Sequence, residues 1–253
     1  MAAETGRAET SRTMSMLWSP QDAPPSSPTG LTLAAIIDAA TAIADERGDT
    51  AVPLRKIGER LGCTAMALYT YVGGKEELLD LMYDRAHAEF GAAPPVSVIE
   101  WTERLLELYL AHPWMLDIAH ARPVLGPHQQ QSFELLLGTL VPNGFDRRDV
   151  VAIASSAYSL PAAAARTIVD ARRAQSEAGA DDEPWWNPRL EALAAAAPDF
   201  AERFPLANGL SHDEPDRDAY RRGVPVMEQA ARENLRRSIE LLVAGASNSP
   251  KQN

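Results

Sequence analysis

The sequence predicts an all-α protein with two unequal domains. Apolar residues recur at helical spacing through most of the chain, and no segment shows the strict alternation that is typical of strands. Glycine and proline clusters separate the helical segments. A chain of 253 residues is long enough for a small domain joined to a larger one.

Composition excludes several classes of protein. The chain is 45% hydrophobic but has no uninterrupted apolar run of about 18 residues and no basic-then-apolar leader, so we expect a cytoplasmic protein without membrane contact. Cys63 is the only cysteine, which rules out an intrachain disulfide and a multi-cysteine zinc site. We expect no metal and no cofactor.

Charge is distributed unevenly along the chain. The net charge is −11, yet residues 50–75 carry four basic side chains against the single acidic Glu59. This local excess of positive charge on an acidic body predicts a surface that orients the protein on DNA phosphates and opposes non-specific coating of DNA.

Residues 1–28 are predicted to be a disordered tail. The segment is rich in Ala, Glu, Thr, Ser and Pro, and Pro20, Pro24, Pro25 and Pro28 are incompatible with one continuous helix. Arg7 and Arg12 could reach DNA as a flexible arm, but a solvated tail is the more common state of a chain terminus.

The first domain is predicted over residues 29–90. A helix from Leu31 to Arg47 stops at Gly48, and a shorter one from Leu54 to Leu61 stops at Gly62. Thr64 can cap a third helix, from Ala65 to Val72, in which Leu68 and Val72 face inward. Two short helices joined by a glycine-containing turn form a helix-turn-helix, here over residues 53–72. A fourth helix is predicted from Lys75 to Phe90.

The second domain is predicted over residues 91–246, with a tail at 247–253. Ser97 to Glu100 form a capping box that opens a helix ending near Ala111, and Asp146 caps a long helix that contains Pro161. Loops are predicted at Gly179–Pro188 and Pro198–Pro215. The predicted helices are, in order, 97–111, Trp114–Ala119, Pro127–Val141, Arg147–Ser176, Leu190–Ala197 and Ala219–Ala244.

Four motifs then support a resemblance to a known family. They are Leu33-Ala-Ala-Ile-Ile, Leu54-Arg-Lys-Ile-Gly-Glu-Arg-Leu-Gly62, Ala67-Leu-Tyr-Thr-Tyr-Val72 and Lys75-Glu-Glu-Leu-Leu79. In this order and spacing, residues 31–90 resemble the tetracycline-repressor (TetR) family. The segment from His112 through Arg122-Pro123 and Phe133 to Asn143-Gly-Phe145 resembles the family's C-terminal domain. The resemblance implies a homodimeric transcriptional repressor that binds a palindromic operator and is released by a small-molecule effector.

The resemblance also divides the DNA-binding work among residues. Outward residues of the third helix match positions that read bases, Arg55 matches one that reaches a base, and Tyr69, Tyr71 and Lys75 match phosphate contacts. Apolar side chains can touch thymine methyls, and only Arg55 can read guanine by two hydrogen bonds. For Tyr71 the alternative is that it covers the edge of the domain. The predicted DNA-binding residues are Arg55, Thr64, Ala65, Met66, Ala67, Tyr69, Thr70, Tyr71 and Lys75.

Aromatic and polar residues in the second domain predict an effector cavity, because such sites are mostly apolar with a few polar anchors. Aromatic residues at helical spacing are also common in ordinary cores, so each one has both readings. The candidates are Trp101, Tyr109, His112, Trp114, Arg122, Phe133 and Tyr158. Trp185 and Trp186 could cover the cavity or pack between subunits.

The family's magnesium-tetracycline site is not matched. It has a histidine four residues before the Arg-Pro pair, where this sequence has Ile118, and His120 lies about 200° further around a helix. We therefore expect an effector other than magnesium-tetracycline. Dimerisation is expected to use the long 147–176 helix and the last helix of each subunit, packed as a four-helix bundle as the family implies.

Two other classes of protein are alternatives to a ligand-controlled repressor. An enzyme is disfavoured because no glycine-rich phosphate loop, nucleophile elbow or metal-ligand cluster appears and Cys63 has no evident base. An activator or architectural DNA-binding protein without an effector would use the same helix-turn-helix, and the sequence does not set the sign of regulation.

Overall fold

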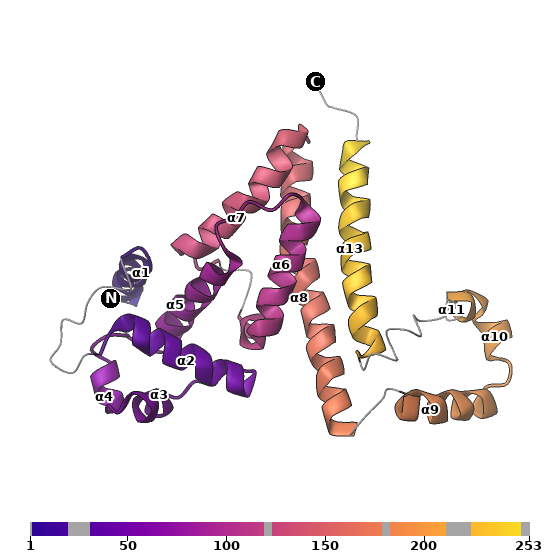
Figure 1. The fold of residues 1–253 in the computed structure, drawn as a ribbon, viewed down its shortest axis with the longest axis horizontal. Coiled ribbons are helices and arrows are strands. Elements are labelled where there is room, and N and C mark those ends of the chain that lie inside the picture. Colours follow the sequence, from indigo (N-terminus) through magenta and orange to yellow (C-terminus); the bar gives the residue numbers. More distant parts are fainter. Residues whose placement is uncertain (1, 20–30, 119–122, 179–182, 211–223, 249–253) are drawn as a thin grey trace. The chain divides into compact units, whose positions relative to one another are not determined.

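The computed structural model describes residues 2–19, 31–118, 123–178, 183–210 and 224–248, and all regular structure within them is helical (Figure 1). The all-α prediction is therefore confirmed for the part of the chain that the structure describes. The chain forms two compact units, Met1–Ala162 with Ile239–Asn253, and Ala163–Ser238.

The helix-turn-helix region has the predicted elements in the first unit. Helices α2 (Leu33–Arg47), α3 (Leu54–Leu61), α4 (Ala65–Leu68) and α5 (Lys75–His87) follow one another. Gly48 and Gly62 end α2 and α3 in the left-handed region, with φ of 69° and 68°. A residue with a side chain is strained in that conformation. The core between these helices is made of fully buried side chains, which include Ile36, Ile37, Ile57, Leu68, Val72, Leu78 and Leu81.

Helix α4 is shorter than the predicted Ala65–Val72. The amides of Thr70 and Tyr71 donate to the carbonyls three residues earlier, at 3.3 and 2.9 Å, and the Thr70 hydroxyl donates to the Ala67 carbonyl at 2.7 Å. These bonds compete with the α-helical pattern and tighten the chain into turns. Leu68 and Val72 are nevertheless fully buried, as expected.

The predicted disordered tail is wrong for residues 2–17, which form helix α1 (Ala2–Leu17). The four prolines all follow this helix, so they do not interrupt it. Leu17 is only 1% exposed, and α1 contacts α5. A weakly amphipathic segment is helical here because it packs against another helix, which is the usual source of helix stability in proteins.

The remaining helices of the first unit lie close to their predicted positions. Short 3₁₀ helices η1 (Ala88–Phe90), η2 (Pro113–Asp117) and η3 (Val141–Asn143) alternate with longer helices. The longer helices are α6 (Val98–Ala111), α7 (Pro127–Leu140) and the start of α8 (Arg147–Ala178). Ser97 caps α6 as predicted, since its hydroxyl accepts from the Glu100 amide at 3.2 Å. Asp146 accepts from the Arg148 amide at 2.8 Å at the start of α8.

The second unit contains more helix than the sequence predicted. Helix α9 spans Glu183–Ala196, and α10 (Phe200–Arg203) and α11 (Pro205–Leu210) occupy part of the second predicted loop. The two loop predictions are therefore wrong at 183–188, 200–203 and 205–210. Pro184 and Pro205 lie in first helical turns, where proline is tolerated, whereas Pro188 lies inside α9. The last helix, α13, spans Val226–Ser247, so Ser247 belongs to this helix and not to the predicted tail. The predicted start of the helix at Ala219 lies outside the described residues.

An ion-pair cluster joins two helices within the second unit. Arg172 on α8 donates to both carboxylate oxygens of Glu228 on α13, at 2.7 and 2.6 Å, and Arg232 adds a bond of 3.1 Å. Burial opposes ionisation of Glu228, but the two arginines outweigh it and lower its pKa. Among the described residues, no helix combines the length and the apolar character that a bilayer crossing requires.

Candidate nucleic-acid interface and ligand cavity

The turn between α3 and α4 depends on the close approach of Gly58. A Cβ atom at this position would lie 2.6 Å from the carbonyl oxygen of Cys63, which is closer than real Cβ contacts. The Cys63 amide donates to the Gly58 carbonyl at 2.9 Å, so both sides of the contact are backbone. Gly58 therefore sets the distance between α3 and the segment that leads into α4.

The base-reading candidates form one exposed edge around α4. Met66 is 74% exposed, an unusual state for a large apolar side chain. Thr64 and Thr70 are exposed, whereas Ala65 and Ala67 are half-buried. The Thr64 hydroxyl accepts from the Ala67 amide at 3.3 Å, so it caps the helix as predicted. The geometry leaves Met66 as the most prominent apolar side chain of this edge.

The three phosphate candidates are placed differently. Tyr69 is 52% exposed. Lys75 is also exposed and opens α5. The Tyr71 hydroxyl donates to the Leu31 carbonyl at 3.2 Å. This bond favours the alternative in which Tyr71 covers the edge of the domain.

Positive charge on this surface is partly paired. Arg55, on α3, has an 81% exposed side chain with Glu59 at 3.5 Å, and Arg60 bonds Glu46 on α2 at 2.8 Å. Exposed ion pairs are weak and exchange readily for other partners. Arg55 is therefore accessible for a base contact, while Arg60 is bonded to its own domain.

A cavity of about 410 Å³ lies in the first unit. This volume is within the range of small-molecule sites. Its wall comes from α5, the segment before α7, α7 itself and α8, and none of its described lining residues is charged. The lining residues are Tyr83, Ile118, Pro123, Val124, Leu125, Gln129, Gln130, Phe133, Ser155, Tyr158 and Ser159.

The polar side chains that line the described part of the cavity are neutral. Burial raises the pKa of Tyr83 and of Tyr158 to about 12. Both phenols therefore stay protonated at physiological pH and can donate hydrogen bonds. Together with Gln129, Gln130 and the two serines, they offer both donors and acceptors. The cavity is chemically suited to an uncharged, largely apolar molecule with oxygen substituents.

Two of the seven predicted ligand residues, Phe133 and Tyr158, line this cavity, with ring centroids 6.3 Å apart. Trp101, Tyr109 and Trp114 are fully buried and do not line it. Trp101 bonds the Ser132 carbonyl at 2.8 Å and packs edge-on against Tyr158, so it supports the wall from behind. These three aromatic residues belong to the core, which was the alternative to ligand contact for each aromatic candidate.

His112 also lies away from the cavity. Its ring nitrogens contact Asp45 at 2.8 Å and Glu89 at 3.2 Å, and Trp114 donates to the same Asp45 oxygen at 2.8 Å. These bonds join the end of α6 to α2 and η1. Arg122 and the side chains of Trp185 and Trp186 lie outside the described residues.

Sequence reasoning missed most of the cavity wall. One signal was available: Gln129 and Gln130 are adjacent amides in the first turns of a helix opened by Pro127. A second is the spacing of Ser155 and Ser159, four residues apart on α8, which places both on one helix face with Tyr158 beside them. The contributions of Tyr83 and Val124 have no comparable sequence signal.

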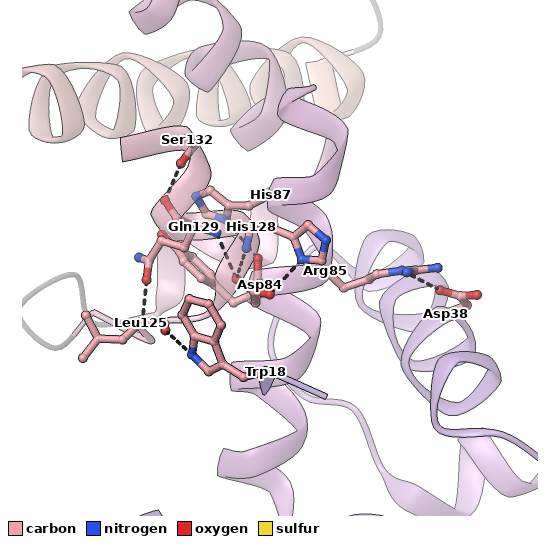
Figure 2. A network of polar contacts seen from close by, with 10 residues as sticks. Trp18, Asp38, Asp84, Arg85, His87, Leu125, His128, Gln129 and Ser132 are labelled. Carbon is pink, nitrogen blue, oxygen red and sulfur yellow. Dashed lines mark hydrogen bonds and ion pairs between the residues drawn. The ribbon is translucent and has the colours of Figure 1, made fainter. Parts of the chain in front are cut away.

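A buried carboxylate connects α5 to the start of α7 (Figure 2). Asp84 on α5 is fully buried and accepts from the backbone amides of His128 and Gln129, at 3.0 and 2.9 Å, and from His128 Nδ1 at 2.9 Å. It thus satisfies free amides in the first turn of α7, the helix that carries Gln129 and Phe133. A Cβ atom on Gly126 would overlap this carboxylate.

These features define the chain as a helix-turn-helix DNA-binding protein with a separate cavity. The family model described as "Bacterial regulatory proteins, tetR family" matches residues 36–82. The chain is 32% identical over 220 residues to the HTH-type transcriptional repressor DrrR1 of Streptomyces coeruleorubidus, covering 83% of this chain and 80% of that protein. The protein belongs to the TetR family of transcriptional regulators.

A second relative is similar in sequence, and two solved structures are similar in fold. An HTH-type transcriptional regulator of Saccharopolyspora erythraea is 32% identical over 187 residues, or 71% of this chain and 77% of that protein. Among solved structures, ActR of Streptomyces coelicolor in complex with actinorhodin has a TM-score of 0.64 at 23% identity, covering 85% of this chain and 95% of ActR. Apo ActR has a TM-score of 0.59 at 22% identity, covering 87% of this chain and 98% of ActR. The structural similarity shows the fold.

Proposed function

We propose that the protein is a homodimeric repressor that binds a palindromic operator and is released by an uncharged, largely apolar small molecule. The observation that carries the proposal is that one helix, α5, begins at the exposed Lys75, a predicted phosphate contact, and contributes Tyr83 to the wall of the cavity. A helix of this length spans roughly 20 Å. The repressor DrrR1 supports the sign of regulation.

On DNA, the exposed edge of α4 would enter the major groove, with Tyr69 and Lys75 holding phosphates. Met66 offers an apolar contact to thymine methyls, and the exposed Arg55 guanidinium can bond O6 and N7 of a guanine. We infer an operator with one Arg55-dependent G·C pair in each half-site beside a thymine-rich stretch.

Arg55→Ala should weaken binding to the native operator by about 1–3 kcal/mol and remove the preference at that one base pair. The measurement is fluorescence anisotropy with the operator and with a duplex substituted at the G·C pair. Lys56→Ala is the matched control, because it removes the same charge from an adjacent exposed position and should weaken both duplexes equally. If Arg55→Ala weakened both duplexes equally as well, the base-reading role would be wrong.

The effector class follows from the cavity. Ile118 lines it, so the position that would supply a magnesium ligand in the family's tetracycline site is apolar here. Neutral phenols, amides and serine hydroxyls between apolar walls fit a planar aromatic molecule with hydroxyl or carbonyl groups. Actinorhodin, bound by ActR, is a reasonable first compound to test.

Phe133→Ala should weaken the binding of any compound that releases the protein from its operator. We expect a loss of affinity of at least about tenfold, or about 1.4 kcal/mol, because the half-buried ring is part of the cavity wall. Operator affinity without the compound should stay within twofold. Val141→Ala, an exposed position just after α7, is the control and should change neither quantity. If the same concentration of compound released the wild-type protein, Phe133→Ala and Val141→Ala from the operator, the effector would bind outside this cavity.

The homodimer is supported by exposed apolar side chains on the helices that the family uses for dimerisation. Val151 on α8 is 62% exposed, and Leu241 on α13 is 57% exposed. Contiguous exposed apolar surface marks interaction sites, and both side chains would contribute to such a surface in the dimer. Sedimentation at micromolar concentration should give a dimer, and a monomer would refute this part.

A further inference from the structure

Helix α1 is an addition in front of the helix-turn-helix, and its contacts reach the segment that leads into α5. The Thr13 hydroxyl donates to Glu77 Oε2 at 3.2 Å, and Arg12 Nη2 donates to the Tyr71 carbonyl at 3.2 Å and lies 3.5 Å from Glu77 Oε1. The Glu77 side chain is only 10% exposed. The Glu77 carboxylate is therefore shielded from water, whereas the Arg12 side chain is 46% exposed and its bond to Tyr71 lies at the surface.

The segment held in this way is the one between α4 and Lys75. The Gly73 amide donates to Glu77 Oε1 at 2.6 Å, and a Cβ atom on Gly73 would lie 2.7 Å from Arg12 Nη1. Arg12 thus packs directly on the backbone that separates Tyr69 from Lys75. Its own bonds are to protein atoms, which argues for a positioning role and against the flexible DNA-binding arm considered for this residue.

The other end of α1 reaches the wall of the cavity. Trp18 follows the helix, and its indole Nε1 donates to the Leu125 carbonyl at 3.1 Å (Figure 2). The indole is 60% exposed, and this hydrogen bond joins its Nε1 to the backbone of Leu125. Leu125 lines the cavity, and its amide donates to Gln129 Oε1 at 2.8 Å.

Leu125 is also in a conformation that its own side chain disfavours. Its φ is 61°, and among the described residues it is the one non-glycine residue with positive φ. Such a conformation persists when the surroundings hold it, here through bonds to both peptide groups of the residue. A molecule that displaced Leu125 would let its backbone leave the left-handed conformation and would break the hydrogen bond from Trp18 Nε1 at the same time.

We propose that α1 is a strap that couples the cavity wall at Leu125 to the DNA-contacting segment at residues 71–77, with Arg12 and Trp18 as its positioning residues. Displacement of Leu125 moves Trp18, and the helix transfers this movement to Arg12 and Thr13. The inference rests on the proposed function, since it takes the cavity as the effector site and residues 64–75 as the DNA surface. Coupling between two sites is reciprocal, so operator binding must also act on Leu125.

This reciprocity gives a test that requires no effector. Operator binding should slow hydrogen exchange of the Leu125 amide at least threefold in the full-length wild-type protein. Trp18→Phe keeps an aromatic ring but removes the donor, and it should abolish most of that slowing. Ser11→Ala, on an exposed position of α1, is the matched control and should retain it. Arg12→Ala should weaken operator binding by about three- to tenfold.

The alternative route runs through α5 and Asp84, and it predicts a different result. If Trp18→Phe kept the full operator-induced slowing at Leu125, or if the wild-type protein showed none, the strap would be refuted. Exchange of the Gly73 amide without operator shows whether α1 is still docked in each variant. A wild-type protein that binds no operator would instead refute the proposed function, so the two failures are distinguishable.

Discussion

Asp84→Ala should lower the free energy of unfolding by about 3 kcal/mol, because each buried donor left without a partner costs about 1–3 kcal/mol and two backbone amides lose theirs. For a chain of this size the melting temperature should fall by roughly 6–12 °C. The variant should still bind operator normally at temperatures where it is folded, since Asp84 stabilises the start of α7 and is not among the predicted DNA contacts.

Thermal denaturation followed by circular dichroism measures the effect on stability. Asp84→Asn retains one acceptor oxygen and should recover part of the loss, which separates the lost hydrogen bonds from any change in side-chain volume. Gly126→Ala should reproduce the destabilisation by overlap with the carboxylate. A melting temperature within 2 °C of wild type for Asp84→Ala would show that the carboxylate does not hold the start of α7.

Gly58→Ala is expected to reduce operator affinity at least about 100-fold, or about 2.7 kcal/mol. The new Cβ atom would meet the Cys63 carbonyl at 2.6 Å, and because that atom is backbone, α3 and the turn must move apart. Overpacking of this kind typically costs 1–3 kcal/mol, and here it also changes the angle at which α4 is presented.

Gly138→Ala on α7 is the matched control, because nothing lies within 4 Å of its Cβ position. It should leave operator affinity unchanged and stabilise the helix slightly. If Gly58→Ala bound operator within threefold of wild type, the close approach would not determine the recognition geometry.

The sequence predicted the helix-turn-helix well because its boundaries are set by local chemistry. Gly48 and Gly62 adopt the left-handed conformation that ends a helix, and Thr64 supplies a capping hydroxyl. Each of these signals acts within a few residues, so it can be read without knowing the tertiary structure.

Features that depend on distant contacts were not predictable in the same way. Helix α1 was missed because Leu17 is its only buried apolar residue among the side chains described, and its polar bonds join residues about 60 positions apart. The cavity was only partly predicted, since aromatic residues serve cores and cavities alike. Trp101 and Phe133 look equivalent in sequence, yet one is fully buried and the other faces the cavity.

The most direct test of the proposed function is nuclease footprinting of the intergenic DNA upstream of the gene, with and without actinorhodin and each of a set of neutral aromatic compounds. We predict one protected palindrome whose half-sites are about one helical turn apart, and protection that is lost when an aromatic effector is added. Absence of any protected site would contradict the account. A site that stayed protected in the presence of every neutral aromatic compound tested would contradict the proposed release by an effector.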